Sequence, residues 1–343
     1  MDYSDAPQVL RDFLIYHETI CGHSKATVDQ YYLDLRMFLR FLKLDRGLAP
    51  RTAELDEISI ADVDLSFLRA VTLTEVYSFL AYLSRDRVRQ PNAHEPEYGL
   101  SASSRARKIA AIRSFFKYLT VKAKLLEENP VQDLDSPKIP KTLPHYLTLE
   151  ESKRLLSVVD GKNKERDYCI LVLFMNCGMR LSELVSINYS DIKPDNTIII
   201  TGKGNKQRTV YLNDACVSAI KDYMKVRPVD GVKDKEALFL SNRKTRISPK
   251  TVQHIVDEYL EKSGLSGQGF STHKLRHTAA TLMYQYGHVD VLQLKEILGH
   301  ENLATTEIYT HVVDEQLRSA VDSNPLNKVK IKRKKSESDS DEN

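Results

Sequence analysis

Two cationic side chains, His273 and Arg276, stand three residues apart in the stretch STHKLRHTAATLM. Residues at this spacing share one face of a helix, so both side chains would point toward a common place, while Leu275 and Ala279 cover another side. Imidazole and guanidinium donors on one face suit an anion. Considered alone, the more ordinary explanation is a solvated helix face that carries an exposed arginine.

His273 and His277 also have the i, i+4 spacing of two metal ligands on a helix. No third ligand is spaced nearby, and a guanidinium beside a cation site is unfavourable, so we expect no metal ion here. A thiolate zinc site and a disulfide framework are not expected either, because no C-x-x-C pair occurs among the four cysteines Cys21, Cys169, Cys177 and Cys216.

Two further basic residues lie earlier in the chain. Arg180 follows an apolar run that Gly178 closes, and Glu183 is within reach for an i, i+3 ion pair. Lys203 lies in TGKGNKQR, where two β-rich runs flank a turn. Taken singly, Arg180 is a helix-end charge and Lys203 a hairpin tip. The glycines lack the spacing of a phosphate-binding loop, so nucleotide binding has only weak support.

The stretch GHENLATTEIYTHV places Tyr309 nine residues after His300. As an isolated residue, Tyr309 would be an ordinary half-buried aromatic. A phenol has an ordinary pKa of ~10, so it attacks well at neutral pH only with a proton acceptor or a strongly cationic setting. The interpretation of Tyr309 therefore depends on its partners.

The order of these residues along the chain is the most informative feature. CGMRLSEL, TGKGNKQR, THKLRHTAATLM and LGHENLATTEIYTHV follow one another between about Leu147 and Val313. In this order they resemble the motifs of the tyrosine recombinase, or phage integrase, family, and are most similar to its Xer-like branch. The resemblance is looser over residues 1–130.

The resemblance implies a catalytic set that acts on one phosphate: Arg180, Lys203, His273, Arg276, His300 and Tyr309. Breaking a DNA strand by transesterification requires a nucleophile, charge neutralisation around phosphorus and a proton for the departing sugar oxygen. The phenol of Tyr309 would be the nucleophile, His273 its base and Lys203 the acid.

Arg180 and Arg276 would bind nonbridging oxygens in place of a metal ion, because a guanidinium stays charged and matches two oxygens at once. His300 would add a hydrogen bond, and Glu183 would orient the cluster from behind. The implied product is a 3′-phosphotyrosyl link, which conserves the energy of the phosphodiester. Strand exchange through a Holliday junction then needs neither ATP nor a cofactor.

Apolar residues at helical spacing predict a mainly α fold with a small β-sheet or hairpin. At 343 residues the chain fits two domains. We expect a helical core-binding domain over 1–135, a Pro-rich linker over 136–146, a tyrosine recombinase catalytic domain over 147–327 and a disordered charged tail over 328–343. Thr148 followed by Glu151 predicts a capping box where the second domain restarts.

The partner that the resemblance implies is double-stranded DNA with a specific recombination site. Residues 101–126 hold no acidic side chain, which favours a phosphate-facing helix, although a solvated face explains the pattern nearly as well. The candidate DNA contacts are Lys25, Arg105, Arg107, Lys108 and Arg113. Apolar residues keep helical spacing over 313–321. The resemblance implies that this segment docks on a neighbouring protomer in a homotetramer or heterotetramer, and packing within the same chain is the alternative.

Properties of the whole chain say more about where the protein acts than about which reaction it performs. The net charge of +3 says little about partners. No stretch approaches the ~18 continuous apolar residues of a membrane span, and no leader is evident, so we expect a cytoplasmic protein. Either chromosome dimer resolution, linked to chromosome partition and cell division, or mobile-element integration and excision fits the sequence. The alternatives are a noncatalytic DNA-binding relative and a type IB topoisomerase-like enzyme.

Overall fold

The structure, a computed structural model, describes residues 2–50, 52–88, 97–138, 145–202, 207–287, 289–300, 302 and 306. The chain divides into two compact units, Met1–Lys141 and Thr142–Asn343. The described residues are mainly helical with one two-stranded sheet, so the predicted fold class is confirmed. The predicted linker lies partly outside the described residues and the predicted tail wholly outside them.

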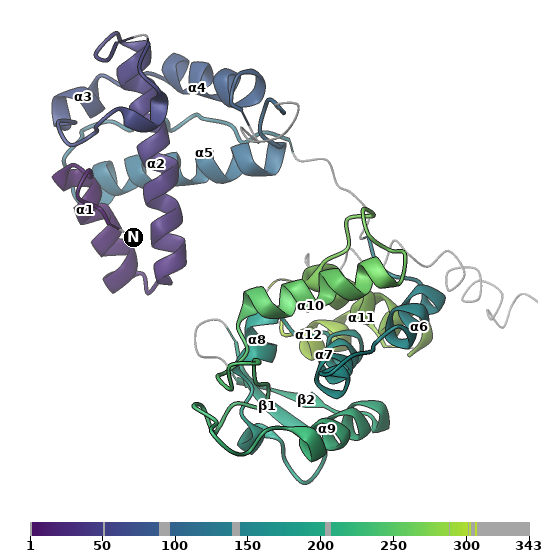
Figure 1. Ribbon diagram of the computed structural model, residues 1–343. Helices are drawn as coiled ribbons and strands as arrows, with labels where there is room; N and C mark the ends of the chain where they lie inside the picture. Colours follow the sequence, from purple (N-terminus) through teal and green to yellow (C-terminus); the bar gives the residue numbers. More distant parts are fainter. Residues whose placement is uncertain are drawn as a thin grey trace, which may run out of the picture. The chain divides into compact units, whose positions relative to one another are not determined.

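The first unit is a set of helices around an aromatic core. They are α1 (Gln8–Ile15), η1 (Tyr16–Ile20), α2 (Lys25–Asp45), η2 (Leu55–Glu57), α3 (Leu65–Arg69), α4 (Leu73–Arg85), α5 (Ala102–Lys117) and η3 (Tyr118–Lys122). The long helix α2 packs against α4 and α5 (Figure 1). Its start follows from Ser24, whose hydroxyl accepts from the N–H of Thr27 as an N-cap. The largest buried side chains of the core include Phe13, Tyr32, Phe38, Phe79, Phe115 and Phe116.

The second unit surrounds one buried helix, α7. Its elements are α6 (Leu149–Ser157), α7 (Lys164–Cys177), α8 (Leu181–Ser186), η4 (Tyr189–Asp191), β1 (Thr197–Thr201), β2 (Gln207–Tyr211), α9 (Asp214–Val226), α10 (Pro249–Lys262), α11 (Thr272–Tyr286) and α12 (Val291–Leu298). The run CILVLFM in α7 is apolar on every face because α6, α9, α10 and α11 all pack against this helix. The hairpin and α9 lie together at one end of the unit (Figure 1).

Local signals account for the ends of several of these helices. The capping box predicted at Thr148 is confirmed, because its hydroxyl accepts from the N–H of Glu151 and the Glu151 carboxylate accepts from the N–H of Thr148. Ser248 caps α10, and Pro249 is its first residue. Strands β1 and β2 pair antiparallel with Ile198 opposite Val210. None of the helices described in either unit is long and apolar enough to cross a bilayer.

Candidate active site

The candidate residues that the structure describes lie close to the C-terminal end of α7. Gly178 ends this helix in the left-handed region, at φ 58° and ψ 34°, which glycine adopts without steric strain. A β-carbon here would lie 2.7 Å from Cδ2 of Leu298, so the joint also packs closely against α12. Two residues later, Arg180 is the N-cap residue of α8. The conformation of Gly178 therefore determines how the chain turns from α7 into α8, and with it the position of Arg180.

Glu183 is the buried centre of the arrangement, with 2% of its surface exposed. Its Oε1 accepts from Nη1 of Arg180 at 2.7 Å, and its Oε2 accepts from the backbone N–H of Arg180 at 2.7 Å and from Nη2 of Arg208 at 2.9 Å. Nη1 of Arg276 lies 3.8 Å from the same oxygen. Burial would raise the pKa of Glu183, but the charge of Arg208 and the bonds from Arg180 outweigh burial and lower it. The carboxylate is therefore ionised at neutral pH.

The same arginines also bind the C-terminal end of α12. The last carbonyls of a helix have no partner within the helix, and they attract cations. Here three consecutive carbonyls each accept from a different guanidinium: Ile297 from Arg208 at 2.7 Å, Leu298 from Arg276 at 2.7 Å and Gly299 from Arg180 at 3.1 Å. His300 follows directly, so these bonds fix the backbone from which its imidazole projects.

Arg276 and Arg180 differ in exposure. The Arg276 side chain is 4% exposed, and its Nη1 also donates to the carbonyl of Gly178 at 2.7 Å, so it ties the end of α7 to the end of α12. The alternative of an exposed arginine on a solvated helix face is therefore wrong for Arg276. The Arg180 side chain is 39% exposed, so part of it is accessible to solvent although it pairs with the buried Glu183.

His273 and His277 lie on α11 with their Nε2 atoms 3.1 Å apart, so one ring donates to the other. Burial, with the nearby charge of Arg276, lowers the pKa of His273. Burial and His273 lower the pKa of His277 to about 4. Both rings are neutral at neutral pH, and a neutral imidazole can accept a proton. Within the described ranges, no group of three or more His, Cys, Asp or Glu side chains is placed to hold a metal ion.

A hydrogen bond to Thr306 holds the imidazole of His300. Its Nδ1 lies 2.9 Å from Oγ1 of the buried Thr306. Burial, followed by the charges of Arg276 and Arg180, lowers the pKa of His300 to about 4. The ring is thus neutral and close enough to both arginines to be affected by their charge.

The structure brings together five of the seven residues predicted for this site: Arg180, Glu183, His273, Arg276 and His300. The other two, Lys203 and Tyr309, lie outside the described residues. Lys203 belongs to the connection between β1 and β2, and Tyr309 follows α12 in the chain. Their positions stay predictions.

Sequence reasoning missed Arg208, which contacts both Glu183 and α12. A signal was present in the alternation of the hairpin, where every second residue faces the same side. Arg208 stands opposite Ile200 and shares its face with Val210, whose partner is Ile198. An arginine among buried aliphatic residues needs an acceptor, but the sequence does not show which one.

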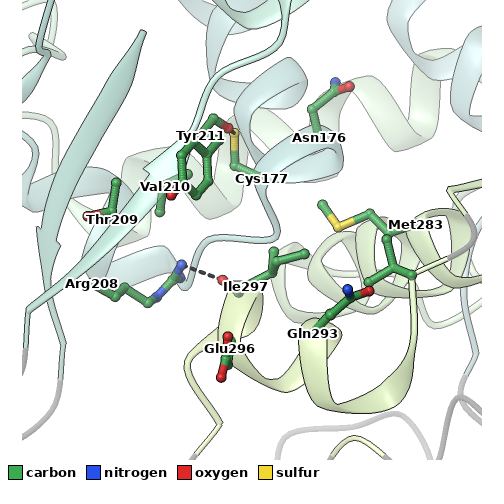
Figure 2. A pocket seen from close by; sticks show the side chains of 11 residues that line it. Asn176, Cys177, Arg208, Thr209, Val210, Tyr211, Met283, Gln293, Glu296 and Ile297 are labelled. Carbon is green, nitrogen blue, oxygen red and sulfur yellow. Dashed lines mark hydrogen bonds between the residues drawn. The ribbon is translucent and has the colours of Figure 1, made fainter. Parts of the chain in front are cut away.

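A cavity of about 560 Å³ opens beside Arg208. β2, α11, α12 and the end of α7 line it with residues that include Cys177, Tyr211, Met283 and Gln293. Figure 2 shows the Arg208 side chain reaching from β2 to the end of α12, where a dashed line marks its bond to the Ile297 carbonyl. The guanidinium group thus separates a largely apolar hollow from the polar cluster around Glu183.

The candidate DNA contacts in the first unit need one correction. Lys108 does not present its ammonium group to solvent: its side chain is 6% exposed, and Nζ donates to Oδ1 of the buried Asp34 at 2.7 Å. Burying Asp34 without a cation would be costly, which explains why Lys108 points inward. Arg107 lies on the rim of this pair, with Nη1 3.0 Å from Oδ2 of Asp34 and 45% of its side chain exposed.

The other candidate DNA contacts, Lys25, Arg113 and Arg105, are not paired with a buried carboxylate of the described residues as Lys108 is. Nζ of Lys25 donates to the Tyr3 hydroxyl at 2.7 Å, and the Lys25 side chain is half exposed. Nη1 of Arg113 donates to the hydroxyl of Ser136 at 3.1 Å. Arg105 is half-buried. Their contact with DNA stays a prediction.

Proteins of known sequence match most of the chain. The model of the phage integrase family matches residues 145–316. A protein named tyrosine recombinase XerC from Caldanaerobacter subterraneus subsp. tengcongensis is 53% identical over 320 residues, which cover 93% of this chain and 87% of that relative. A protein of the same name from Myxococcus xanthus is 34% identical over 323 residues, covering 92% of this chain and 96% of the relative.

Solved structures show a similar fold. The XerH site-specific recombinase bound to a palindromic difH substrate matches with a TM-score of 0.62 at 21% identity, covering 92% of this chain and 94% of that one. A lambda integrase (75–356) dimer bound to a COC′ core site matches with a TM-score of 0.59 at 17% identity, covering 86% and 96%. At these identities the likeness concerns the fold, a helical unit followed by a unit with a hairpin.

Proposed function

Because the chain belongs to the phage integrase family of tyrosine recombinases, we propose that the cluster around Glu183 is its active site and acts on one DNA phosphate. The protein is a site-specific tyrosine recombinase, an enzyme that transfers DNA strands. The names of its relatives do not favour the two alternatives, a noncatalytic DNA-binding relative and a topoisomerase-like enzyme.

In the proposed reaction, the phenol oxygen of Tyr309 attacks phosphorus, and the bond from phosphorus to the 5′ oxygen breaks. The phenol proton passes to the neutral ring of His273, whose lowered pKa keeps it free to accept at neutral pH. Lys203 gives a proton to the departing 5′ oxygen. In the reverse reaction, a new 5′ hydroxyl attacks the phosphotyrosine and rejoins the strand. Lys203 takes up the hydroxyl proton, and His273 returns its proton to the phenol. Two such exchanges, through a Holliday junction, complete recombination.

The arginines and His300 would stabilise the phosphoryl transition state. Arg180, whose side chain is partly exposed, would bind one nonbridging oxygen. His300, neutral beside two cations, can donate a hydrogen bond to another without repelling them. Arg276 is held rigidly by two carbonyls, so its charge needs little reorganisation during the reaction. No step requires a metal ion or a cofactor.

One observation carries this proposal: Arg180 at the N-cap of α8, Arg276 on α11 and the end of α12 before His300 meet around the single carboxylate of Glu183. Hydrogen bonds across 119 and 98 residues of sequence, from Arg180 to Gly299 and from Arg276 to Gly178, close this cluster. An arrangement of only surface charges would not bury Arg276 and Glu183.

The protein's partner is DNA, and we propose double-stranded DNA with a specific recombination site. Arg107, Arg113 and Lys25 would contact phosphates from the first unit. Assembly as a homotetramer or heterotetramer is part of the proposal, but residues 313–321, which would dock on a neighbour, lie outside the described residues. The chemistry is common to chromosome dimer resolution and to mobile-element integration or excision.

A nicked duplex tests the proposed function. A recombination site is first selected from randomised DNA by binding, and a nick is then placed so that the short fragment released by cleavage diffuses away. The protein should become covalently attached to the remaining strand, because rejoining is blocked. Tyr309→Phe should bind the same duplex with unchanged affinity and form no covalent complex. A covalent complex with Tyr309→Phe would refute the assignment.

A further inference from the structure

Arg208 occupies an unusual position for a charged residue. It is the second residue of β2 and stands opposite Ile200, on the hairpin face that includes the buried Ile198 and Val210. Its side chain is 14% exposed. Burial lowers the pKa of Arg208, and Glu183 counteracts that effect, but an arginine remains charged in either case. The chain therefore buries a permanent cation directly beside its proposed active site.

The two ends of the Arg208 guanidinium bind two different elements. Nη2 donates to Oε2 of Glu183 at 2.9 Å, across 25 residues of sequence, and Nη1 donates to the carbonyl of Ile297 at 2.7 Å, across 89 residues. The first bond ties β2 to α8, and the second ties β2 to the C-terminal end of α12. Both bonds involve a charged partner or a helix end, which makes them stronger than ordinary neutral hydrogen bonds.

The backbone before His300 is shaped around the Arg208 side chain. A β-carbon on Gly299 would lie 2.7 Å from Cδ and 2.9 Å from Nε of Arg208, and Gly299 has a φ of +65°. A larger residue would therefore be strained and would also displace Arg208. The close approach lets the peptide that leads into His300 rest on the Arg208 stem.

Arg208 also changes the charge balance of the cluster. Glu183 carries one negative charge and would offset much of the field of Arg180 if it had no other partner. Arg208 supplies a third cation that does not need to reach the phosphate, so the group of three arginines and one carboxylate keeps a net charge of +2. Without Arg208 that charge falls to +1, in a site where positive charge stabilises the transition state.

From these contacts, and resting on the proposed function, we propose that Arg208 is a positioning residue for strand transfer. It holds the end of α12, and with it His300, near Glu183, and it offsets the charge of Glu183 so that Arg180 can bind the phosphate and the fixed charge of Arg276 can act on it. It does not itself touch the DNA. Neither the comparisons nor the sequence pattern assigned a role to this residue.

The test measures single-turnover cleavage of the nicked duplex at saturating protein, with DNA affinity measured separately. Arg208→Met should bind DNA within about 3-fold of the unchanged protein but cleave on the order of 100-fold more slowly, the size expected when a fixed charge is removed from a preorganised site. Arg208→Lys, which restores the charge but cannot reach both partners, should lose about 10-fold.

Arg166→Met is the matched control. The Arg166 side chain is 8% exposed, against 14% for Arg208, and it also binds one carboxylate, that of Asp167 at 2.8 Å, and one carbonyl, that of Leu240 at 3.1 Å. It lies in the first turn of α7, at the opposite end of that helix from Gly178. Arg166→Met should lower stability to a similar degree, yet the folded fraction should cleave at the unchanged rate.

A double-mutant cycle separates positioning from general structural support. If Arg208 acts through Glu183, then adding Arg208→Met to Glu183→Gln should slow cleavage by less than about 5-fold further. Full additivity of the two losses, an unchanged cleavage rate in folded Arg208→Met, or an equal loss in Arg166→Met would each overturn the proposal. If Arg208→Met does not fold, Arg208→Lys takes its place in the cycle.

These outcomes differ from a failure of the proposed function. If the unchanged protein forms no covalent complex, or Tyr309→Phe still forms one, the proposed function fails. If the complex depends on Tyr309 and Arg208→Met cleaves normally, only the inference about Arg208 fails.

Discussion

At the residue scale, Glu183 and its guanidinium partners form the charged centre of the proposed active site. A carboxylate with 2% exposure is stable as an anion because cations surround it. Those cations, in turn, satisfy the carbonyls at the end of α12. The two histidines with the most lowered pKa values, His277 and His300, lie beside the same charges. Each group in the cluster thus depends on the charge state of its neighbours.

The histidines predict how stability depends on pH. An unfolded histidine has a pKa of ~6.5, whereas the pKa of His277 and of His300 in the folded chain is about 4. Between these values the unfolded chain binds more protons, so the free energy of unfolding should be fully present above pH ~6.5 and fall as the pH decreases toward ~4. His300→Gln should flatten this decline in urea unfolding. A decline as steep in His300→Gln as in the unchanged protein would contradict the lowered pKa of His300.

Lys108 gives a second prediction at this scale. Lys108→Met leaves the buried Asp34 with Arg107 at 3.0 Å as its remaining cation, so it should lower the free energy of unfolding by about 2–4 kcal/mol. Lys117→Met changes an exposed lysine of the same helix and should cost less than ~0.5 kcal/mol. Chemical denaturation of both variants provides the comparison. Equal, small losses would show that Lys108 is free for DNA after all.

At the element scale, the ends of helices position the site. Gly178 is the C-cap of α7, Arg180 the N-cap of α8 and Gly299 the C-cap of α12, and these three termini meet. Helix termini carry unpaired N–H and C=O groups together with partial charge, which makes them suitable places to anchor ionised side chains. The interior of α7, buried in the core of the second unit, supplies the rigidity behind them.

Gly178→Ala tests this arrangement against a matched glycine. Both Gly178 and Gly264 have a positive φ, of 58° and 68°, but only at Gly178 would a β-carbon meet another element, Cδ2 of Leu298 at 2.7 Å. Gly264→Ala should cost about 1 kcal/mol and leave cleavage unchanged. Gly178→Ala should cost ~2–4 kcal/mol and slow cleavage by the folded protein, since the joint and α12 must separate. Equal effects on stability and cleavage would rule out a role for the joint.

Local sequence signals made the starts of several helices predictable. Contacts between residues far apart in the sequence were not predictable in this way. The starts of α2, α6 and α10 follow from a capping residue and its near neighbours, which a sequence displays directly. The inward turn of Lys108 depends on Asp34, which lies 74 residues away, and Arg208 depends on Glu183 and Ile297. The family order of motifs predicted the other candidate residues, and the structure places Arg180, Glu183, His273, Arg276 and His300 close together.

At the scale of the whole molecule, the two units have separate cores. One hydrophobic cluster runs from Ala6 to Leu134 in the first unit. In the second unit a large cluster runs from Leu147 to Leu275, and Ala280, Leu294 and Leu298 form a small one. Each unit therefore has what an independent domain requires. Under the proposed function, the first unit would bind DNA while the second carries the chemistry.

Expression of residues 1–138 and 145–343 as separate polypeptides tests that independence. Each should show a helical circular dichroism spectrum and a cooperative unfolding transition, because each retains its whole cluster of buried residues. The two midpoints should match transitions of the full chain. A fragment 1–138 that unfolds without cooperativity would contradict the two-core description.

The most direct test of the central claim is the identity of the amino acid that becomes linked to DNA. After trapping on a nicked duplex, the complex is digested with protease and nuclease, and the peptide that retains a nucleotide is sequenced by mass spectrometry. We expect one modified peptide, with a 3′-phosphate ester on Tyr309, and none when Arg180 is replaced by alanine. Attachment through another residue, or cleaved DNA without any attached peptide, would contradict the account.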